Sequence, residues 1–213
     1  FHFGALPRYP GDNPVFWQVR NREPFGAVSV HHMDENLDTG PILKIEPVRI
    51  FPQDSFGMVC IKFSYVVVEL IRVVVSRLEA EGENLKYIPQ DKITTQYSAD
   101  AGIKDVTIDW DTQDASEIMA LVNATNPWNI GAFTYIRGIP LRILEVSHMP
   151  VIGDDVSPGV LPGTIVALNE ESGLLVACRD DKILRLEILH TDMGFITGKR
   201  LIALGVQVGE RFG

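Results

Sequence analysis

Residues 26–50 read GAVSVHHMDENLDTGPILKIEPVRI, and this stretch places two strand-like runs on either side of a polar loop. The runs 26–33 and 42–50 are interpreted as strands, and the second has the alternating apolar residues typical of strands. The segment between them concentrates Asp, Asn, Gly and Pro, which favour turns. We therefore predict two strands joined by a loop that presents Asp38 at a strand end.

A second loop rich in Pro and Gly lies upstream, in PRYPGDNPVFW (7–17). It follows His2 and runs into NPVFWQVRN (13–21), which we predict to be a short helix with Asn13 as its N-cap. A carboxylate facing an imidazole orients the ring and favours its protonated form, so His2 and Asp38 could move protons together. With five histidines and many aspartates in the chain, spacing alone leaves a structural role as the commoner explanation.

The most apolar segment of the chain is IKFSYVVVELIRVVVSRL (61–78). Its four charged residues argue against a membrane crossing. We predict a soluble helix over residues 54–82, capped by Asp54 or Ser55, with a wide apolar arc that packs against a sheet.

A polar, acidic connector over residues 80–107 lacks any regular period and predicts a linker. We therefore divide the chain into domains 1–95 and 96–213. Beyond the linker, a helix is predicted with its cap in 111–114 and its end before Asn126-Pro127.

Five short strand-like runs follow this helix: AFTYIRG (132–138), PLRILEVS (140–147), GTIVAL (163–168), GLLVAC (173–178) and ILRLEIL (183–189). The turn signals GD, PG, EESG and RDDK separate them. That spacing predicts a small β-barrel.

Composition narrows the class of protein. The 213 residues are 46% apolar and 22% charged, which fits one large or two small soluble domains. The two cysteines, Cys60 and Cys178, are too few for a disulfide framework or a zinc site, so we expect reduced thiols and a cytoplasmic protein. The net charge is −9, and from Asp100 onward 9 basic residues face 16 acidic ones. This balance disfavours a nucleic-acid partner such as tRNA.

Several residues are weaker candidates for a site. His31 and His32 follow each other in a strand, so we expect one to face the core and the other solvent, and we predict no metal role. Trp128 is expected to anchor the barrel against the preceding helix. Lys199 and Arg200 could contact an anionic acceptor, but two adjacent cations more often form a solvated face. FITGK also lacks the upstream glycine and strand that a phosphate-binding loop requires.

Four motifs stand in order along the chain: HFGALPRYPG (2–11), HHMDENLDTGPIL (31–43), IDW (108–110) and NPWNIGAF (126–133). Together they resemble the folate-dependent formyltransferase family, which includes methionyl-tRNA formyltransferase and formyltransferase domains that act on nucleotide-linked amino sugars. The family pattern is approximately Asn-x-His-x-Ser-Leu-Leu-Pro-x-Tyr-x-Gly, Leu-Asp-x-Gly, Ile-Asp-Trp and Pro-Trp-Pro-Gly-Ala. The resemblance implies an α/β fold, in which the C-terminal part of a Rossmann-like formyltransferase domain precedes a small OB-like β-barrel domain.

Carried onto this sequence, the family's catalytic histidine matches His2 and its catalytic aspartate matches Asp38. The family's catalytic asparagine would stand immediately before Phe1, outside this sequence. The resemblance places the formyl end of the donor, 10-formyltetrahydrofolate, between the two loops. Four residues are expected at the folate: Leu6, Pro7, Asp34 and Gly40.

The chemistry of formyl transfer explains why these residue types are needed. A neutral amine attacks the formyl carbon, and negative charge develops on the formyl oxygen. Asn and protonated His can donate hydrogen bonds to that oxyanion, a kind of donor whose loss costs about 3 kcal/mol in hydrolases. Asp supports the imidazole and helps to remove the surplus protons of the amine. In a chain that begins at Phe1, His2 would lie on a frayed terminus.

We therefore predict an N-formyltransferase that moves a formyl group from 10-formyltetrahydrofolate to a primary amine. The acidic second half favours a small amine such as a nucleotide-linked amino sugar, and the two-domain layout keeps initiator methionyl-tRNA as the alternative. Gly4 and Ala5 replace the family's Ser-Leu, and Pro10 replaces a common Arg, so the acceptor stays open. An inactive remnant or binding module is the third hypothesis, and the oligomeric state is not predicted.

Overall fold

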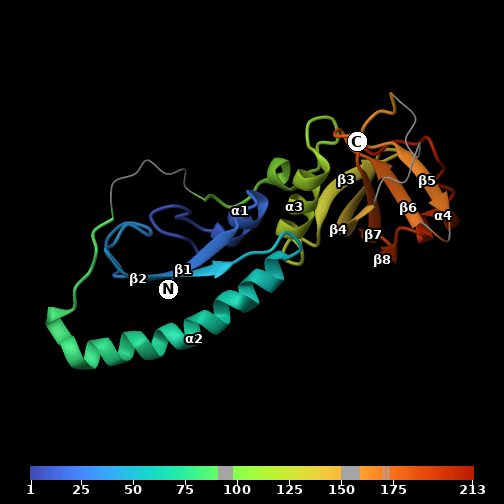
Figure 1. Cartoon of the computed structure of the whole chain (residues 1–213). Coiled ribbons are helices and arrows are strands. Elements are labelled where there is room, and N and C mark those ends of the chain that lie inside the picture. The colour runs from blue at the N-terminus through green and yellow to red at the C-terminus, as the bar shows by residue number, and fades with distance from the viewer. Residues whose placement is uncertain (91–97, 150–158, 170, 172) are drawn as a thin grey trace. The chain divides into compact units, whose positions relative to one another are not determined.

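The computed structural model describes residues 1–90, 98–149, 159–169, 171 and 173–213. The chain divides into two compact units, Phe1–Ala101 and Gly102–Gly213, and each has its own sheet and buried core (Figure 1). The domain boundary predicted between residues 95 and 96 lies outside the described residues, as does the middle of the predicted linker.

The first unit is built on an antiparallel pair of strands, β1 (Phe25–His31) and β2 (Ile42–Arg49). Both predicted strands are confirmed. The register shifts between Val30 and His31, and such a bulge at the end of a strand re-aims the side chains beside it. The predicted first helix is also confirmed as α1 (Pro14–Arg20), which begins directly after Asn13.

The long helix α2 (Phe56–Glu81) begins where the sequence predicts. The Ser55 hydroxyl caps it by accepting a hydrogen bond from the Met58 amide at 3.3 Å. The helix ends in a single 3-10 turn, η1 (Gly82–Asn84). No helix in the described part of the chain combines the length and the hydropathy needed to span a bilayer.

The apolar arc of α2 packs less than the sequence suggests. The helix contacts α1, β1 and β2 within its unit, and three of its side chains are buried: Val59, Phe63 and Leu70. Eight other large apolar side chains on the helix are exposed: Met58, Ile61, Tyr65, Val68, Ile71, Val73, Val75 and Leu78. The prediction that the whole arc packs against a sheet is therefore only partly correct.

The second unit places helices beside an antiparallel sheet. Its helices are η2 (Ile103–Val106), α3 (Ala115–Thr125) and α4 (Arg200–Ala203). Its strands are β3 (Ala132–Ile136), β4 (Ile139–Met149), β5 (Ile165–Asn169), β6 (Gly173–Ala177), β7 (Ile183–Thr191) and β8 (Gly194–Thr197). All five predicted strands and the predicted helix are present, whereas β8 and α4 were not predicted.

The sheet runs β3-β4-β7-β6-β5, and β8 pairs with β7. The predicted β-barrel is not confirmed, because the sheet is not closed: no ladder among the described residues joins β3 to β5. Short bridges at the end of the chain lie there instead, where Phe212 pairs with Ile136 and Arg211 with Thr164. The fold is therefore a mixed α/β fold with an open six-stranded sheet in the second unit.

The IDW motif anchors this second core. Trp110 is only 2% exposed, and its indole N–H donates to the Thr134 hydroxyl in β3 at 3.0 Å. Helix α3 begins with a capping box in which Asp114 and Glu117 exchange side-chain to backbone hydrogen bonds, both 2.8 Å long. These local contacts explain why the helix starts where the sequence predicts.

Candidate active site

His2 is held against β1, contrary to the expectation of a frayed terminus. Its N–H donates to the Ser29 carbonyl and its carbonyl accepts from the Ser29 N–H, both at 2.8 Å. The residue is only 8% exposed, and Nε2 lies 2.7 Å from the Tyr9 carbonyl oxygen. A carbonyl can only accept, so Nε2 carries the ring proton.

Gly4 provides the space for the His2 ring. A Cβ at this position would lie 2.4 Å from His2 Nε2 and 2.5 Å from the Tyr9 carbonyl oxygen. Any side chain at residue 4 would therefore force the ring away from Tyr9. Gly4, which stands where the family pattern has Ser, therefore determines where the imidazole lies.

Asp38 is fixed by several groups at the tip of the loop between β1 and β2. Its φ is +56°, in the left-handed region that Asp tolerates better than branched residues do. Its Oδ2 accepts a hydrogen bond from the Gly11 amide at 2.8 Å. The side-chain amide of Gln90 donates to the carbonyls of Asp38 and Gly40 at 2.8 and 2.7 Å. The carboxylate is therefore positioned by both loops and by a more distant residue.

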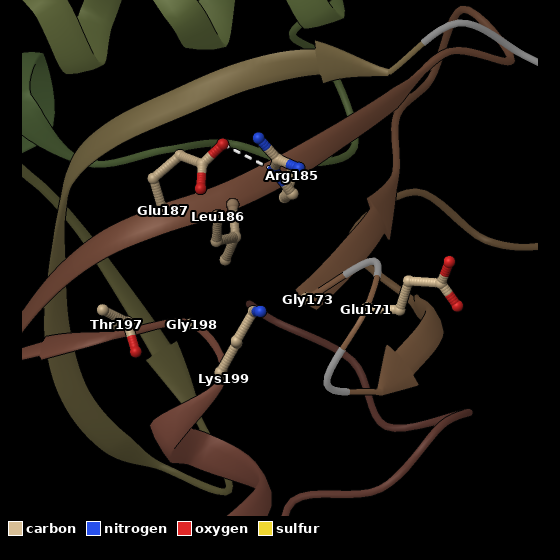
Figure 2. Close-up of a pocket in the computed structure, with 8 residues that line it drawn as sticks. All are labelled: Glu171, Gly173, Arg185, Leu186, Glu187, Thr197, Gly198 and Lys199. Carbon is tan, nitrogen blue, oxygen red and sulfur yellow. Dashed lines mark hydrogen bonds and ion pairs between the residues drawn. The ribbon is translucent and has the colours of Figure 1, made fainter.

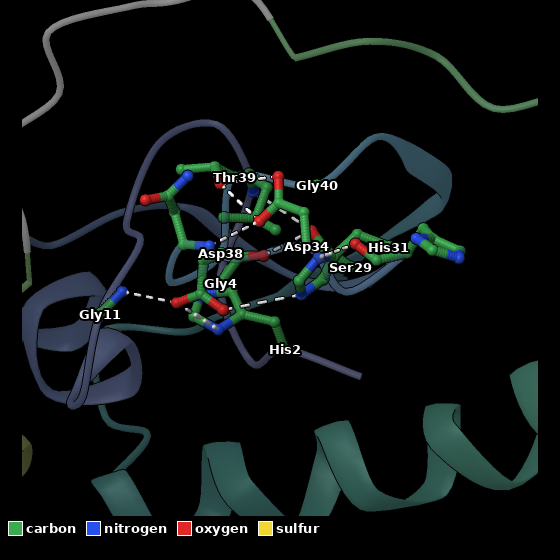
Figure 3. Close-up of polar contacts among 12 residues, drawn as sticks. His2, Gly4, Gly11, Ser29, His31, Asp34, Asp38, Thr39 and Gly40 are labelled. Atoms are coloured by element: carbon green, nitrogen blue, oxygen red, sulfur yellow. Dashed lines mark hydrogen bonds and ion pairs between the residues drawn. The ribbon is translucent and has the colours of Figure 1, made fainter.

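Two imidazoles flank this carboxylate (Figure 3). His2 Nδ1 lies 3.5 Å from Asp38 Oδ2, and His31 Nε2 lies 3.6 Å from Asp38 Oδ1. The Asp38 side chain is 11% exposed and that of His31 is 10% exposed. The structure thus brings the two predicted catalytic residues together and adds His31 to them. No group of three or more His, Cys, Asp or Glu within the described ranges could hold a metal ion.

The charge state of His2 follows from its burial. Desolvation lowers the pKa of His2 below its ordinary 6.5, and this outweighs the Tyr9 carbonyl and the Asp38 carboxylate, which raise it. His31 lowers the pKa further. The neutral ring therefore predominates at pH 7, in contrast to the protonated His2 that the sequence suggested.

Two of the predicted folate residues lie just after His2. Leu6 is 3% exposed, and its amide donates to the buried Ser29 hydroxyl at 3.1 Å. The peptide bond from Leu6 to Pro7 is cis. These residues shape the first loop beneath His2, and their role at a folate stays a prediction.

The other two predicted folate residues lie in the Asp38 loop. The Asp34 carboxylate accepts hydrogen bonds from the Thr39 hydroxyl and the Asn36 amide, at 2.8 and 3.1 Å. These bonds lower the pKa of Asp34, with the Thr39 contact contributing most. Gly40 is buried, and a Cβ on it would lie 1.7 Å from the His32 carbonyl oxygen. Both residues hold the loop in shape.

Sequence reasoning missed two members of this site. His31 faces Asp38 while His32 is exposed beside the Tyr87 ring, at 5.7 Å between centroids, so the expectation of one inward and one outward histidine was correct. His31 ends its strand seven positions before Asp38, and this position at the start of the Asp38 loop was the signal in the sequence that could have placed His31 at the site. Gln90 carries no signal in the sequence, because its partners are backbone carbonyls reached through the fold.

The second unit contains a separate cavity of about 250 Å³ (Figure 2). Lys199 lines it together with Arg185 and Glu187, which form an ion pair at 2.5 Å. Because charges of both signs line this cavity, it lacks the single-sign lining of a phosphate site. Trp128 donates its indole N–H to the Ala124 carbonyl of α3 at 2.6 Å, so it anchors to that helix.

Comparison with known proteins identifies the class. Residues 1–73 match the formyl transferase family and residues 103–199 match the formyl transferase C-terminal domain. The chain belongs to the formyl transferase family.

Individual relatives agree with this assignment. The chain is 32% identical over 212 residues to the methionyl-tRNA formyltransferase of Symbiobacterium thermophilum, a match that covers 99% of this chain and 63% of the relative. It is 28% identical over 217 residues to the methionyl-tRNA formyltransferase of Dictyoglomus turgidum, with 99% and 65% covered. The chain thus spans slightly less than two thirds of the length of these relatives.

Solved structures share the fold. HypX from Aquifex aeolicus in complex with tetrahydrofolic acid superposes with a TM-score of 0.72 at 16% identity, covering 94% of this chain and 34% of HypX. The N-formyltransferase from Helicobacter canadensis in complex with folinic acid and dTDP-3-aminofucose gives 0.64 at 19% identity, covering 87% and 64%. At these identities the likeness establishes the fold and not the substrate.

Proposed function

We propose that this chain carries the catalytic histidine and aspartate of an N-formyltransferase that moves a formyl group from 10-formyltetrahydrofolate to a primary amine. The observation that carries the proposal is the convergence of His2 and Asp38, whose nearest ring nitrogen and carboxylate oxygen lie 3.5 Å apart. Membership of the family and the folate ligands named for its structural neighbours support the choice of donor.

The geometry suits the proton movements of this reaction. The attacking amine loses one proton, and the nitrogen of the departing folate gains one, so a group that accepts and returns a proton serves both steps. The Asp38 carboxylate is such a group, and its Oδ2 is already oriented by the Gly11 amide. The Nε2 proton of His2 can donate to the developing oxyanion once the ring leaves the Tyr9 carbonyl.

A nucleotide-linked amino sugar is the acceptor that we favour. The chain is acidic overall, with a net charge of −9, and a surface that binds tRNA needs clustered cations to neutralise phosphates. Initiator methionyl-tRNA is the second candidate, because the two relatives described above are methionyl-tRNA formyltransferases matched along nearly the whole of this chain. The two acceptors differ in how their binding responds to salt.

The test is a transfer assay with 10-formyltetrahydrofolate and either acceptor. We expect a formylated amino sugar, and we expect His2→Gln and Asp38→Asn to lower kcat by roughly 10²- to 10⁴-fold, the range for general acid–base groups. His32→Gln is the matched histidine control, since its ring faces Tyr87, and it should retain activity. Undiminished turnover in both site variants would remove these residues from the mechanism. Methionyl-tRNA binding that weakens steeply with salt would overturn the preferred acceptor.

A further inference from the structure

The two histidines at Asp38 share an arrangement of their ring nitrogens. His2 places Nε2 2.7 Å from the Tyr9 carbonyl, and His31 places Nδ1 3.1 Å from the His32 carbonyl. Because a carbonyl accepts only, each contact fixes a proton on that nitrogen. The second nitrogen of each ring, Nδ1 of His2 and Nε2 of His31, faces Asp38. The nitrogens that gain and lose a proton are therefore the two that flank the carboxylate.

These two rings are close enough to influence each other. Their centroids lie 6.5 Å apart in an edge-on arrangement, and both side chains are at most 10% exposed. Two imidazolium ions at that separation repel, whereas a single one is stabilised by the carboxylate between them.

We propose that His31 is a positioning residue for Asp38 and the second holder of the proton that Asp38 takes from the amine. This inference rests on the proposed function for its catalytic meaning. Once it is protonated, His31 can donate from Nε2 to Oδ1, while the Gly11 amide and His2 face Oδ2. A proton taken from the amine by Asp38 passes to His31 Nε2 and returns by the same route to the departing folate nitrogen, so the reaction gains and loses none.

His31 lies where the pairing of β1 with β2 is irregular. The strand register shifts between Val30 and His31, where the strand meets the Asp38 loop. The Asp34 carboxylate is a further charged group near the cluster and interacts with His31. It accepts hydrogen bonds from the Thr39 hydroxyl (Figure 3).

The test is an NMR titration of the chain labelled in its histidine rings. We follow the ring signal of His2, whose pKa in the wild type lies below its ordinary 6.5. In His31→Gln, His2 should titrate at a higher pH than in the wild type, because the positive charge of His31 no longer opposes its protonation. His32→Gln is the control and should leave the His2 signal unchanged. An unaltered His2 curve in His31→Gln would overturn the proposal.

The kinetic arm separates this inference from the proposed function. We expect His31→Gln to lower kcat by roughly 10- to 100-fold, the effect of misplacing a reacting group by about 1 Å, with the KM for the donor unchanged. Circular dichroism confirms that the variant is folded, and His31→Asn provides a second non-titrating side chain. A raised KM with unchanged kcat would contradict the positioning role. A wild-type protein that transfers no formyl group to any amine would contradict the proposed function, while the His2 titration still tests whether His31 acts on this cluster.

Discussion

Replacing Gly40 with Ala is the most demanding test of how the Asp38 loop is built. A Cβ on Gly40 would lie 1.7 Å from the His32 carbonyl oxygen and 2.9 Å from its carbonyl carbon. Both are backbone atoms, which cannot rotate away as a side chain can. The two segments must therefore separate by well over 1 Å to reach ordinary van der Waals contact.

The cost follows from the contacts that this separation disrupts. The His32 amide donates to the Pro41 carbonyl at 2.9 Å, and the Gln90 side chain donates to the Gly40 carbonyl at 2.7 Å. Each lost hydrogen bond costs about 1 kcal/mol, and overpacking itself costs about 1–3 kcal/mol. We expect the free energy of unfolding of the first unit to fall by about 3–5 kcal/mol in total.

Urea unfolding, monitored by amide hydrogen exchange in peptides from β1 and β2, measures the loss of stability of the first unit alone. The control is Gly82→Ala, where φ is +51° but nothing lies within 4 Å of the new Cβ. That control should cost about 1 kcal/mol, from backbone strain alone. Gly40→Ala should therefore lower the free energy of unfolding clearly more than Gly82→Ala does.

If Gly40→Ala lowers the free energy of unfolding no more than Gly82→Ala does, the reasoning is refuted, because the backbone at Gly40 would then not be in contact with the backbone at His32. The same variant should also move Asp38 away from His2. The pKa of His2 should then fall further, since the carboxylate is one of the groups that raise it.

Three other predictions follow from single residues. The pKa of His2 is below 6.5 in the folded chain, so the unfolded chain binds the proton first as the pH falls. The stability that neutral His2 provides is therefore present above pH 6.5 and is lost as the pH falls just below it. Urea unfolding at several pH values measures this loss, and the His2→Gln variant should not show it. Gln90→Ala should cost about 1–2 kcal/mol through two lost hydrogen bonds and should speed amide exchange in the loop around Asp38, whereas unchanged exchange would contradict the anchoring role. Burial raises the pKa of Cys178 to about 12, so this thiol should resist alkylation at pH 8 until the chain unfolds. Rapid labelling of Cys178 in the native protein, detected by mass spectrometry, would contradict its burial.

Local signals in the sequence predicted the elements of this fold well. Ser55 and Asp114 are capping residues whose effect depends only on their immediate neighbours, and both helices begin directly after them. The strands before and after the Asp38 loop were also predicted, since turn residues delimit them. By contrast, β8 is only four residues long, too short for a periodic pattern to stand out.

Features that depend on distant segments were not predictable in this way. Whether a sheet closes depends on the pairing of its first and last strands, and the bridges at Arg211 and Phe212 that lie there instead of a ladder have no sequence signature. At the candidate site, the pairing of His2 with Asp38 came from the family pattern. The part played by His31 depends on a one-residue register shift, which alternation of apolar residues does not encode.

The uncovered side of α2 has a practical consequence for handling this polypeptide. Eight large apolar side chains on one helix form an exposed hydrophobic surface. Surfaces of this kind bind hydrophobic dyes and associate with one another. Purified preparations should therefore show concentration-dependent light scattering that rises with salts such as sulfate, which strengthen apolar association. Dilute, low-salt buffers with mild detergent are the conditions in which its intrinsic chemistry can be observed.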